Sequence, residues 1–195
     1  MSHTQHSLLL WWVVGLGCSL SLATVGWADT RSGLAWLAAQ QQPHGSYATP
    51  TDLATPVQAT AEVLRALAAL GEPSTPARLA AQAFLRAETA PHTVYLALQI
   101  RQRAEAGDAT APLVSVLLTH RNPDGGFGDL PGYKSTALDT AWALAALAVP
   151  DVTVPASVIP TAVAFLRAQQ RADGGWALGL NAPAVALSAL AMHGL

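Results

Sequence analysis

The chain has 195 residues, of which 51% are hydrophobic and 11% are charged, and its formal net charge is −2. This composition excludes a disordered chain, which could not bury enough apolar surface to fold. The ten basic residues are scattered, so the chain lacks the basic patch that marks a nucleic-acid-binding protein. Alanine and leucine dominate the hydrophobic share, which favours closely packed helices over sheets.

The first 28 residues have the plan of an export signal. An apolar stretch covers residues 8–25, and Gly26-Trp27-Ala28 places small residues at −3 and −1 of a cleavage after Ala28. We therefore expect a signal peptide over residues 1–28, a folded domain over residues 29–195, and a secreted or periplasmic location. No Lys or Arg precedes the apolar stretch, so an uncleaved membrane anchor over residues 8–25 is the alternative.

The helical segments follow one another from residue 31 onward. Apolar positions recur at i, i+3, i+4 and i+7 in four shorter segments, residues 33–42, 76–87, 111–121 and 160–171. Each is followed by an Ala/Leu-rich segment that is apolar on most sides, residues 56–71, 92–107, 135–148 and 183–194. Prolines stand near expected starts and glycines near expected ends: Pro76, Pro112, Pro160, Gly71, Gly107 and Gly194. The pattern predicts an all-α fold of about four helical hairpins.

Three loops in this pattern align without gaps. They read QPHGSYA from Gln42, NPDGGFG from Asn122 and RADGGWA from Arg171, with offsets of 122 − 42 = 80 and 171 − 122 = 49 residues. The larger offset is near two periods of about 40 residues, so a degenerate copy is expected between the first two. The stretch AQAFLRA from Ala81 resembles AVAFLRA from Ala162 and is followed by no glycine loop. The second unit has therefore lost its loop.

These motifs resemble a known family. An aromatic-Leu-x3-Gln-x3-Gly-x-Trp pattern is formed by Phe165, Leu166, Gln170, Gly174 and Trp176. It is similar to the repeat of squalene and hopene cyclases, and NPDGGFG resembles the repeats of protein prenyltransferase β subunits. Members of this prenyltransferase and squalene-cyclase family close six hairpins into an α/α toroid around a cavity. With about four hairpins, the resemblance implies a partial toroid, an α-solenoid-like arc.

The repeated loop residues have structural roles in this interpretation. We expect the repeat staples, Gln41, Gly45, Tyr47 and Gln170, to hold the loops, with the glutamines bonding the free N–H groups that open the next helix. The candidate ligand or rim residues are Asp124, Gly125, Gly126, Phe127, Asp129, Asp173, Gly174, Gly175 and Trp176. Asp124 and Asp173 are expected to cap the following helix. Phe127 and Trp176 are expected to cover the glutamine amides, as staples rather than ligand contacts.

The family's catalytic residues are missing at the matching positions. Terpene-protonating cyclases carry Asp-x-Asp-Asp-Thr-Ala, whose middle Asp is the acid, where this chain has TALDTA over residues 136–141. Leu138 therefore occupies the place of the proton donor, and leucine cannot deliver a proton. Asp139 is a weak catalytic candidate that more simply favours the positive end of the helix dipole.

A metal site is not expected either. Zinc-dependent prenyltransferases need an Asp, a Cys and a His, but the only cysteine, Cys18, lies before the expected cleavage. Four histidines follow that cleavage, and no two of them have the i, i+3 or i+4 spacing of a local ligand pair: His44, His92, His120 and His193. We expect no metal and no cofactor.

The sequence therefore predicts a non-catalytic extracytoplasmic module that binds a protein partner or an apolar, isoprenoid-like ligand. The alternative is an enzyme, or an enzyme subunit, of the terpenoid cyclase and prenyltransferase class. The last helical segment, residues 183–194, carries only one titratable side chain and no polar helix follows it. We expect this segment to be an interface with a second copy or another protein.

Overall fold

A computed structural model of the chain describes residues 29–48, 54–89 and 91–177. Seven α-helices and no strand are found over these ranges, which confirms the all-α prediction. The expected signal peptide or anchor and the helical segment at residues 183–194 lie outside the described residues. None of the helices within them is long and apolar enough to cross a bilayer.

The helices occur close to where the sequence pattern predicts them. In chain order they are α1 (Thr30–Gln40), α2 (Pro56–Ala69), α3 (Pro76–Ala87), α4 (Thr93–Glu105), α5 (Ala111–Leu118), α6 (Ala137–Leu147) and α7 (Val158–Gln169). The largest difference at a start is in α1, which begins at Thr30 rather than at Gly33. The helix α7 begins two residues before Pro160, which places that proline inside its first turn. A proline is tolerated there because the first N–H groups of a helix have no intrahelical acceptor.

Side chains and glycines fix the helix ends. Thr55 accepts a hydrogen bond from the backbone N–H of Gln58, whose side chain accepts one in return from the N–H of Thr55, a complete capping box. Both α2 and α4 end at a glycine with positive φ, Gly71 and Gly107. Each glycine N–H and the N–H that follows it donate back into the last turn, the bonding pattern of a Schellman motif.

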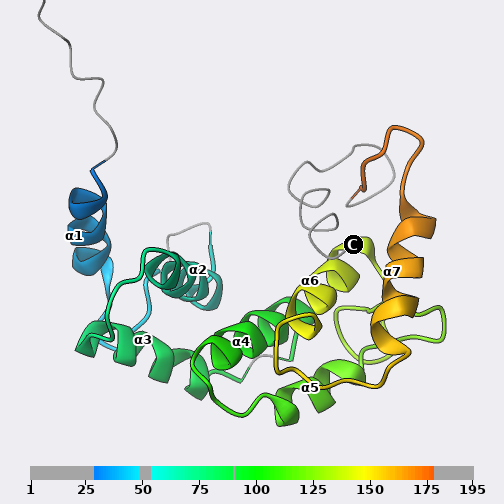
Figure 1. The fold of residues 1–195 in the computed structure, drawn as a ribbon, viewed down its shortest axis with the longest axis horizontal. Helices are drawn as coiled ribbons and strands as arrows, with labels where there is room; N and C mark the ends of the chain where they lie inside the picture. Colours follow the sequence, from blue (N-terminus) through cyan, green and yellow to red (C-terminus); the bar gives the residue numbers. More distant parts are fainter. Residues whose placement is uncertain (1–28, 49–53, 90, 178–195) are drawn as a thin grey trace, which may run out of the picture.

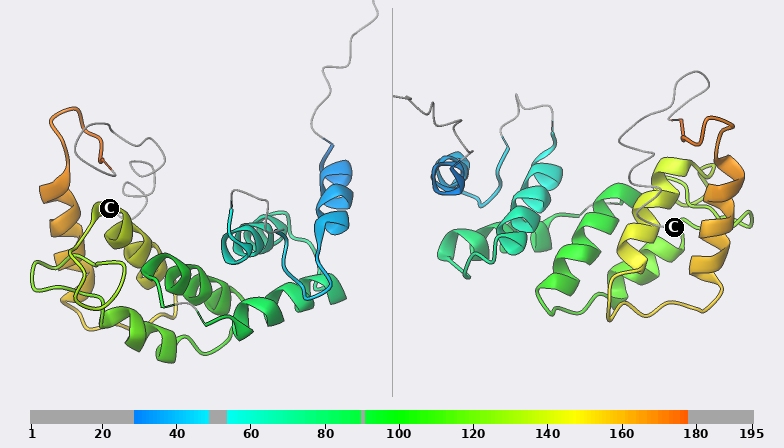
Figure 2. Two further views of the ribbon diagram at one scale, coloured as in Figure 1. Left: turned by 180° about the vertical axis from the view of Figure 1, so that it is seen from behind. Right: turned by 45° about the horizontal axis from the view of Figure 1, so that its top comes forward.

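The helices alternate between two rows (Figure 1). In that view α3, α5 and α7 follow the outer side of a curved row, and α2, α4 and α6 follow its inner side. The two further views keep this order (Figure 2). The most extensive contacts join α4 with α6 and α6 with α7, and α4 also packs against α2 and α5. Each helix therefore packs mainly against helices that are close to it in sequence.

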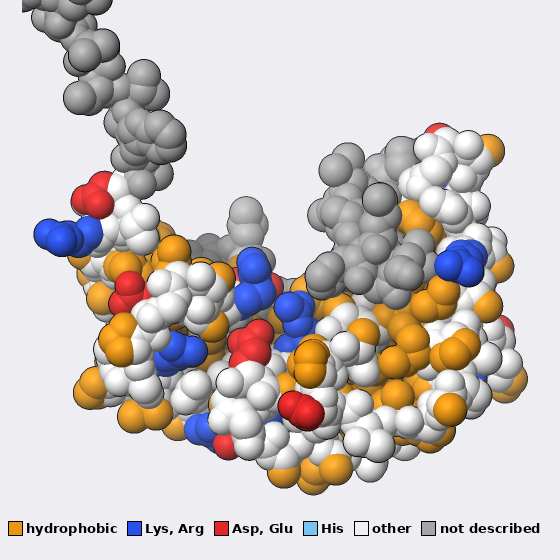
Figure 3. Space-filling view, in the orientation of Figure 1, with side chains coloured by type: hydrophobic (Ala, Val, Ile, Leu, Met, Phe, Trp, Pro, Cys, Tyr) orange, Lys and Arg blue, Asp and Glu red, His pale blue; other side chains and the backbone are white. Residues whose placement is uncertain are grey.

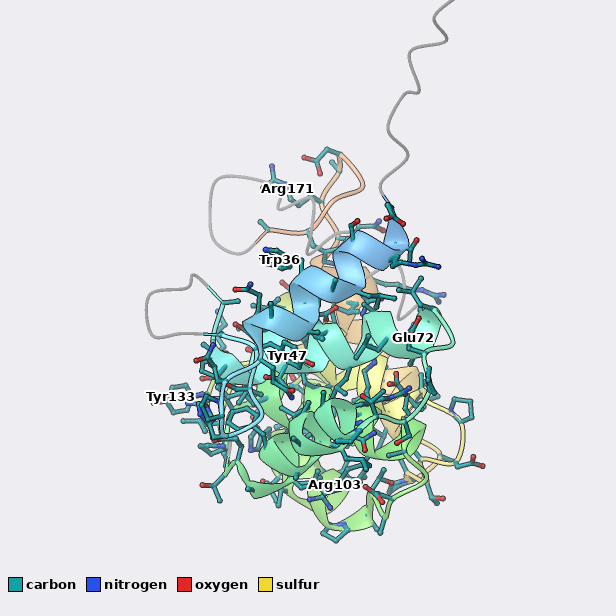
Figure 4. All side chains as sticks on the ribbon, turned by 90° about the vertical axis from the view of Figure 1, so that its left-hand side faces the viewer. Trp36, Tyr47, Glu72, Arg103, Tyr133 and Arg171 are labelled. Atoms are coloured by element: carbon teal, nitrogen blue, oxygen red, sulfur yellow. The ribbon has the colours of Figure 1, made fainter. Side chains whose placement is uncertain are left out.

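The core has two parts. The larger cluster contains Leu144 and Leu147 of α6, Phe127 of the loop before it and Leu166 of α7. A smaller cluster joins α2 and α3, and the side chain of Trp142 packs against both clusters. The first helix, α1, has no buried residue. Its Trp36 side chain is 62% exposed and projects away from the helix (Figure 4).

Candidate functional site

The three glycine loops have the same backbone geometry. In each loop the N–H of the first residue donates to the carbonyl four positions on, and the N–H of the first glycine donates back to the first residue's carbonyl. The bonded pairs are Gln42 with Ser46 and Gly45, Asn122 with Gly126 and Gly125, and Arg171 with Gly175 and Gly174. The aligned sequence repeat is therefore also a structural repeat.

The loop carboxylates stabilise their own turns. Asp124 Oδ1 accepts from the N–H of Gly126 at 3.0 Å, and Asp173 Oδ1 accepts from the N–H of Gly175 at 3.1 Å. The prediction that Asp124 caps the following helix is wrong, because Thr136 performs that role for α6, whereas the helical segment expected after Asp173 lies outside the described residues. An Asp two residues before the bonded N–H forms a local turn more readily than it reaches a helix start.

The staple glutamines act as donors to carbonyl groups. Gln41 Nε2 donates to the carbonyl of Gly45 in its own loop at 3.1 Å and to that of Ala77 in α3 at 2.8 Å. Gln170 Nε2 donates to the carbonyl of Gly174 at 2.8 Å. Among the described residues, neither side chain accepts a bond from a helix-opening N–H group. The glutamine closes its own loop and, in the first unit, also ties that loop to the next outer helix.

Two of the three loops, those of Gly45 and Gly125, pack closely on the outer helix of the following unit. A Cβ at Gly45, whose φ is +98°, would lie 2.4 Å from the carbonyl oxygen of Ala80 in α3. A Cβ at Gly125, whose φ is +87°, would lie 2.8 Å from the carbonyl oxygen of Thr161 in α7. Only glycine combines this backbone conformation with so close an approach. The loop therefore joins its own unit to the next one.

A buried threonine of the inner helix anchors each complete loop. The backbone N–H of Tyr47 donates to Thr60 Oγ1 at 3.1 Å, and that of Phe127 donates to Thr140 Oγ1 at 2.9 Å. Both threonines are fully buried. These threonines are not among the residues predicted from the sequence, although a threonine stands 13 residues after the loop aromatic in both copies.

The aromatic rings of two of the loops belong to the core. Phe127 and Trp176 are fully buried, and Trp176 Nε1 donates to the carbonyl of Leu166 in α7. Tyr47 is half-buried and packs against the smaller cluster. Phe127 and Trp176 are therefore packing residues, in keeping with a staple role rather than with ligand contact at a rim.

Polar side chains gather where α4 and α6 begin. His92 Nδ1 lies 2.8 Å from Asp129 Oδ2. Thr93 Oγ1 donates to the carbonyl of Gly128 and lies 2.8 Å from Nδ1 of His120. Burial lowers the pKa of His120, against the opposing charge of Asp129. Burial therefore favours the neutral form of this imidazole.

Asp139 lies in the same region and is almost entirely buried, with 6% of its surface exposed. Its Oδ2 accepts a hydrogen bond from Thr136 Oγ1 at 2.6 Å. Burial raises the pKa of this carboxyl, more than the bond from Thr136 lowers it, and the charge of Asp129 raises it further. A carboxyl at the start of a helix is ordinarily stabilised as an anion by the helix dipole. The effect of burial on the pKa of Asp139 is therefore larger than that of the helix dipole.

Asp139 borders a pocket of about 300 Å³ together with Val94, Asp129, Thr136, Leu138 and Ala177. Leu138 therefore lies beside the carboxyl at the place where the resembled cyclases carry their acid. Over the described ranges, no three His, Cys, Asp or Glu side chains are grouped so that they could hold a metal ion.

Neither protein-family models nor curated protein sequences match this chain. The resemblance to prenyltransferases and squalene cyclases therefore stays an expectation from the sequence motifs alone.

A second and larger hollow lies between α3, α4 and α5. We call it the α3–α5 groove, and its volume is about 620 Å³. Its lining is mainly apolar and comprises Arg86, Glu88, Thr89, Pro91, Leu96, Gln99, Arg103, Leu113 and Val116. None of these residues was singled out from the sequence. Arg103 lies low on the molecule, far from Trp36 and Arg171 (Figure 4).

The surface is uneven in polarity. In Figure 3, hydrophobic side chains gather over the half of the face that contains α5, α6 and α7, whereas charged side chains are interspersed over α2, α3 and α4. Two of the charged pairs on the latter half are Glu62 with Arg65 and Arg86 with Asp108. Exposed pairs of this kind contribute little to stability.

Proposed function

We propose that the protein is a non-catalytic helical repeat module that binds an apolar or protein ligand, built as a partial α/α toroid. The repeated loop geometry supports this architecture, because the loops of the first and third units both pack on the outer helix of the next unit. Leu138 at the place of the cyclase acid supports the non-catalytic reading. The family resemblance alone would not supply a function.

The observation that carries the proposal is the α3–α5 groove. Its volume of about 620 Å³ lies within the range of about 300–1,000 Å³ that is typical of ligand sites. Leu96, Leu113 and Val116 give it apolar walls, and Val116 is 44% exposed. An apolar hollow with a few polar groups at its edge is the usual form of a binding site.

Native mass spectrometry of the purified protein tests this function. We expect a mass above that of the bare chain, from a retained apolar ligand or a protein partner. The added mass is lost in Val116→Asp and retained in Leu79→Asp, a matched change at an exposed leucine of α3 outside the groove. A bare chain under all conditions would refute the proposal.

The raised pKa of Asp139 favours one second function, that of an acid acting on an isoprenoid-like substrate in the adjacent pocket. A carboxyl that stays protonated to higher pH is a better proton donor near neutrality. Turnover of a squalene-like substrate that disappears in Asp139→Asn and persists in Asp124→Asn would establish this activity. Absence of turnover in the unmodified protein would remove it.

The cellular setting belongs to the same proposal. Export would leave Asp29 as the first residue, and Asp29 is the N-cap of α1, accepting from the N–H of Arg31 at 3.1 Å. The N-cap of α1 would thus directly follow the expected cleavage site. Intact-mass analysis of the native protein distinguishes a chain that starts at Asp29 from one that keeps Met1 as an anchored form.

A further inference from the structure

The α3–α5 groove lies where the second unit lacks its glycine loop. The α5–α6 connection contains such a loop, whereas α3 ends at Ala87 and α4 begins at Thr93, with only residues 88–92 between them. In the complete units the loop packs on the next outer helix, as Gly45 does on α3 and Gly125 does on α7. The corresponding surface for the second unit is on α5.

Sequence alignment identifies this surface in detail. When Asp124 is aligned with Asp173, Leu113 corresponds to Ala162 and Val116 corresponds to Phe165. Phe165 lies against the preceding loop, because a Cβ at Gly126 would be 2.9 Å from its ring. Phe165 is only 8% exposed, and both Leu113 and Val116 line the groove. The groove side of α5 therefore corresponds to the side of α7 that the loop of the third unit covers, but no loop among the described residues covers it.

The side chain of Gln99, which lines the groove, has a hydrogen-bond acceptor that is free within the described part of the chain. Gln99 is 4% exposed, and its Nε2 donates to the carbonyls of Leu85 and Glu88 at 2.7 and 2.9 Å. Its Oε1 has no hydrogen-bond partner among the described residues, although it belongs to a side chain that lines the groove. This oxygen is not among the buried atoms without a partner, so solvent reaches it in the groove, and a backbone N–H of an incoming chain can bond to it in place of water.

The charges at the groove also favour a particular partner. Arg86 is paired with Asp108, whereas the Arg103 guanidinium has no acceptor within the part of the chain that the structure describes. Glu88, the one carboxylate in the lining, is exposed. The loop of the third unit carries the Asp124 carboxylate beside its two glycines and no basic residue. A turn of the same composition would bring an anion to Arg103.

We propose that the α3–α5 groove binds a glycine-rich turn with an acidic residue and an aromatic side chain, supplied by a partner protein. The turn takes the place of the loop that the second unit lacks. Its aromatic or apolar side chain covers Leu113 and Val116, and one of its N–H groups donates to Gln99 Oε1. This inference rests on the proposed binding function and specifies its partner.

A backbone-cyclised peptide with the sequence NPDGGFG, the loop of the third unit, is the probe. Titrated into the purified protein with labelled methyl groups, it is expected to shift the Leu113 and Val116 resonances in a saturable manner. We expect Val116→Asp to weaken binding about tenfold or more, and Leu79→Asp to leave it unchanged. A peptide with alanines in place of both glycines is expected not to bind, because Cβ atoms clash at the equivalent contacts.

Three results would overturn the proposal: no saturable shift, equal binding by Val116→Asp, or equal binding by the alanine peptide. Native mass spectrometry separates this failure from failure of the broader function. One outcome is that the peptide does not bind while the unmodified protein retains an apolar ligand that Val116→Asp loses. In that case the proposed glycine-rich turn is wrong and the binding function stands. If neither binds, both are wrong.

Discussion

Two tryptophans differ in burial and should therefore differ in how much they stabilise the fold. Trp176 is fully buried and donates from Nε1 to the Leu166 carbonyl, whereas Trp36 is 62% exposed. We expect Trp176→Ala to lower the free energy of unfolding by about 3–5 kcal/mol, as for other buried aromatic truncations. Trp36→Ala should change it by less than about 0.5 kcal/mol. Urea denaturation monitored by circular dichroism measures both, and equal losses would contradict the assigned burial.

Asp139 gives a prediction about pH. Its pKa is raised from an ordinary value of 3.8, mainly by burial, so the folded state binds this proton more tightly than the unfolded state does. Stability from this group is therefore present at low pH and is lost as the pH rises from about the ordinary value through the raised one. Replacing Asp139 with Asn removes the ionisation and keeps an acceptor for Thr136.

We accordingly expect Asp139→Asn to have a higher Tm than the unmodified protein at neutral pH, and the difference to shrink as the pH falls below the ordinary carboxyl range. Thermal unfolding measured across that range provides the check. Asp124→Asn, at a carboxylate that bonds only within its loop and to Ser135, is the control. A Tm difference that grows in acid would show the sign to be wrong.

At the scale of the elements, the close approach of the loops to the helices can be tested with two glycines. Gly71 and Gly125 both have positive φ, but a Cβ at Gly71 meets open space while one at Gly125 meets Thr161. Gly71→Ala should therefore lower stability by only about 1–2 kcal/mol, from backbone strain. Gly125→Ala adds a steric clash and should lower it further. Chemical denaturation measures the free energy of unfolding of both variants. Equal decreases would mean that the Gly125 loop does not pack closely on α7.

The threonine anchors can be tested separately. Thr140→Val removes the hydroxyl that accepts from the Phe127 N–H, and it leaves a buried donor unsatisfied, at a cost of about 1–3 kcal/mol. Thr140→Ser keeps the hydroxyl and should lower stability less. Hydrogen exchange at the Phe127 amide reports the contact directly, because it should accelerate in Thr140→Val and not in Thr140→Ser.

The helices and the lost loop could be predicted from the sequence, because periodicity and capping residues are local signals. Gly71 and Gly107 stand at the predicted ends, and the absence of a glycine loop after residues 81–87 is confirmed. The bonds of Gln41, Asp124 and Thr140 could not be predicted. Gln41 bonds to Ala77 of the next unit, and Asp124 and Thr140 bond to the loop of their own unit. Each bond depends on how the folded loop is placed against a helix, and residue spacing alone does not specify that placement.

At the scale of the whole molecule, the last helical segment remains a prediction. Residues 183–194 lie outside the described ranges, and their apolar sequence leads us to expect an interface with a second copy or another protein. Size exclusion with light scattering is the measurement. We expect a dimer or a complex that Leu187→Glu and Leu190→Glu disrupt, whereas a soluble monomer at micromolar concentration would exclude self-association.

The neighbour-to-neighbour packing of the units has a mechanical consequence. Loops join each complete unit to the next, and α1 makes no extensive contact with another helix over the described ranges. A chain pulled from its two ends would then give way in steps, as expected of linear arrays in which each repeat contacts only its neighbours. The first helix would peel away at the lowest force. The largest resistance would come from α4, α6 and α7, where the packing is most extensive.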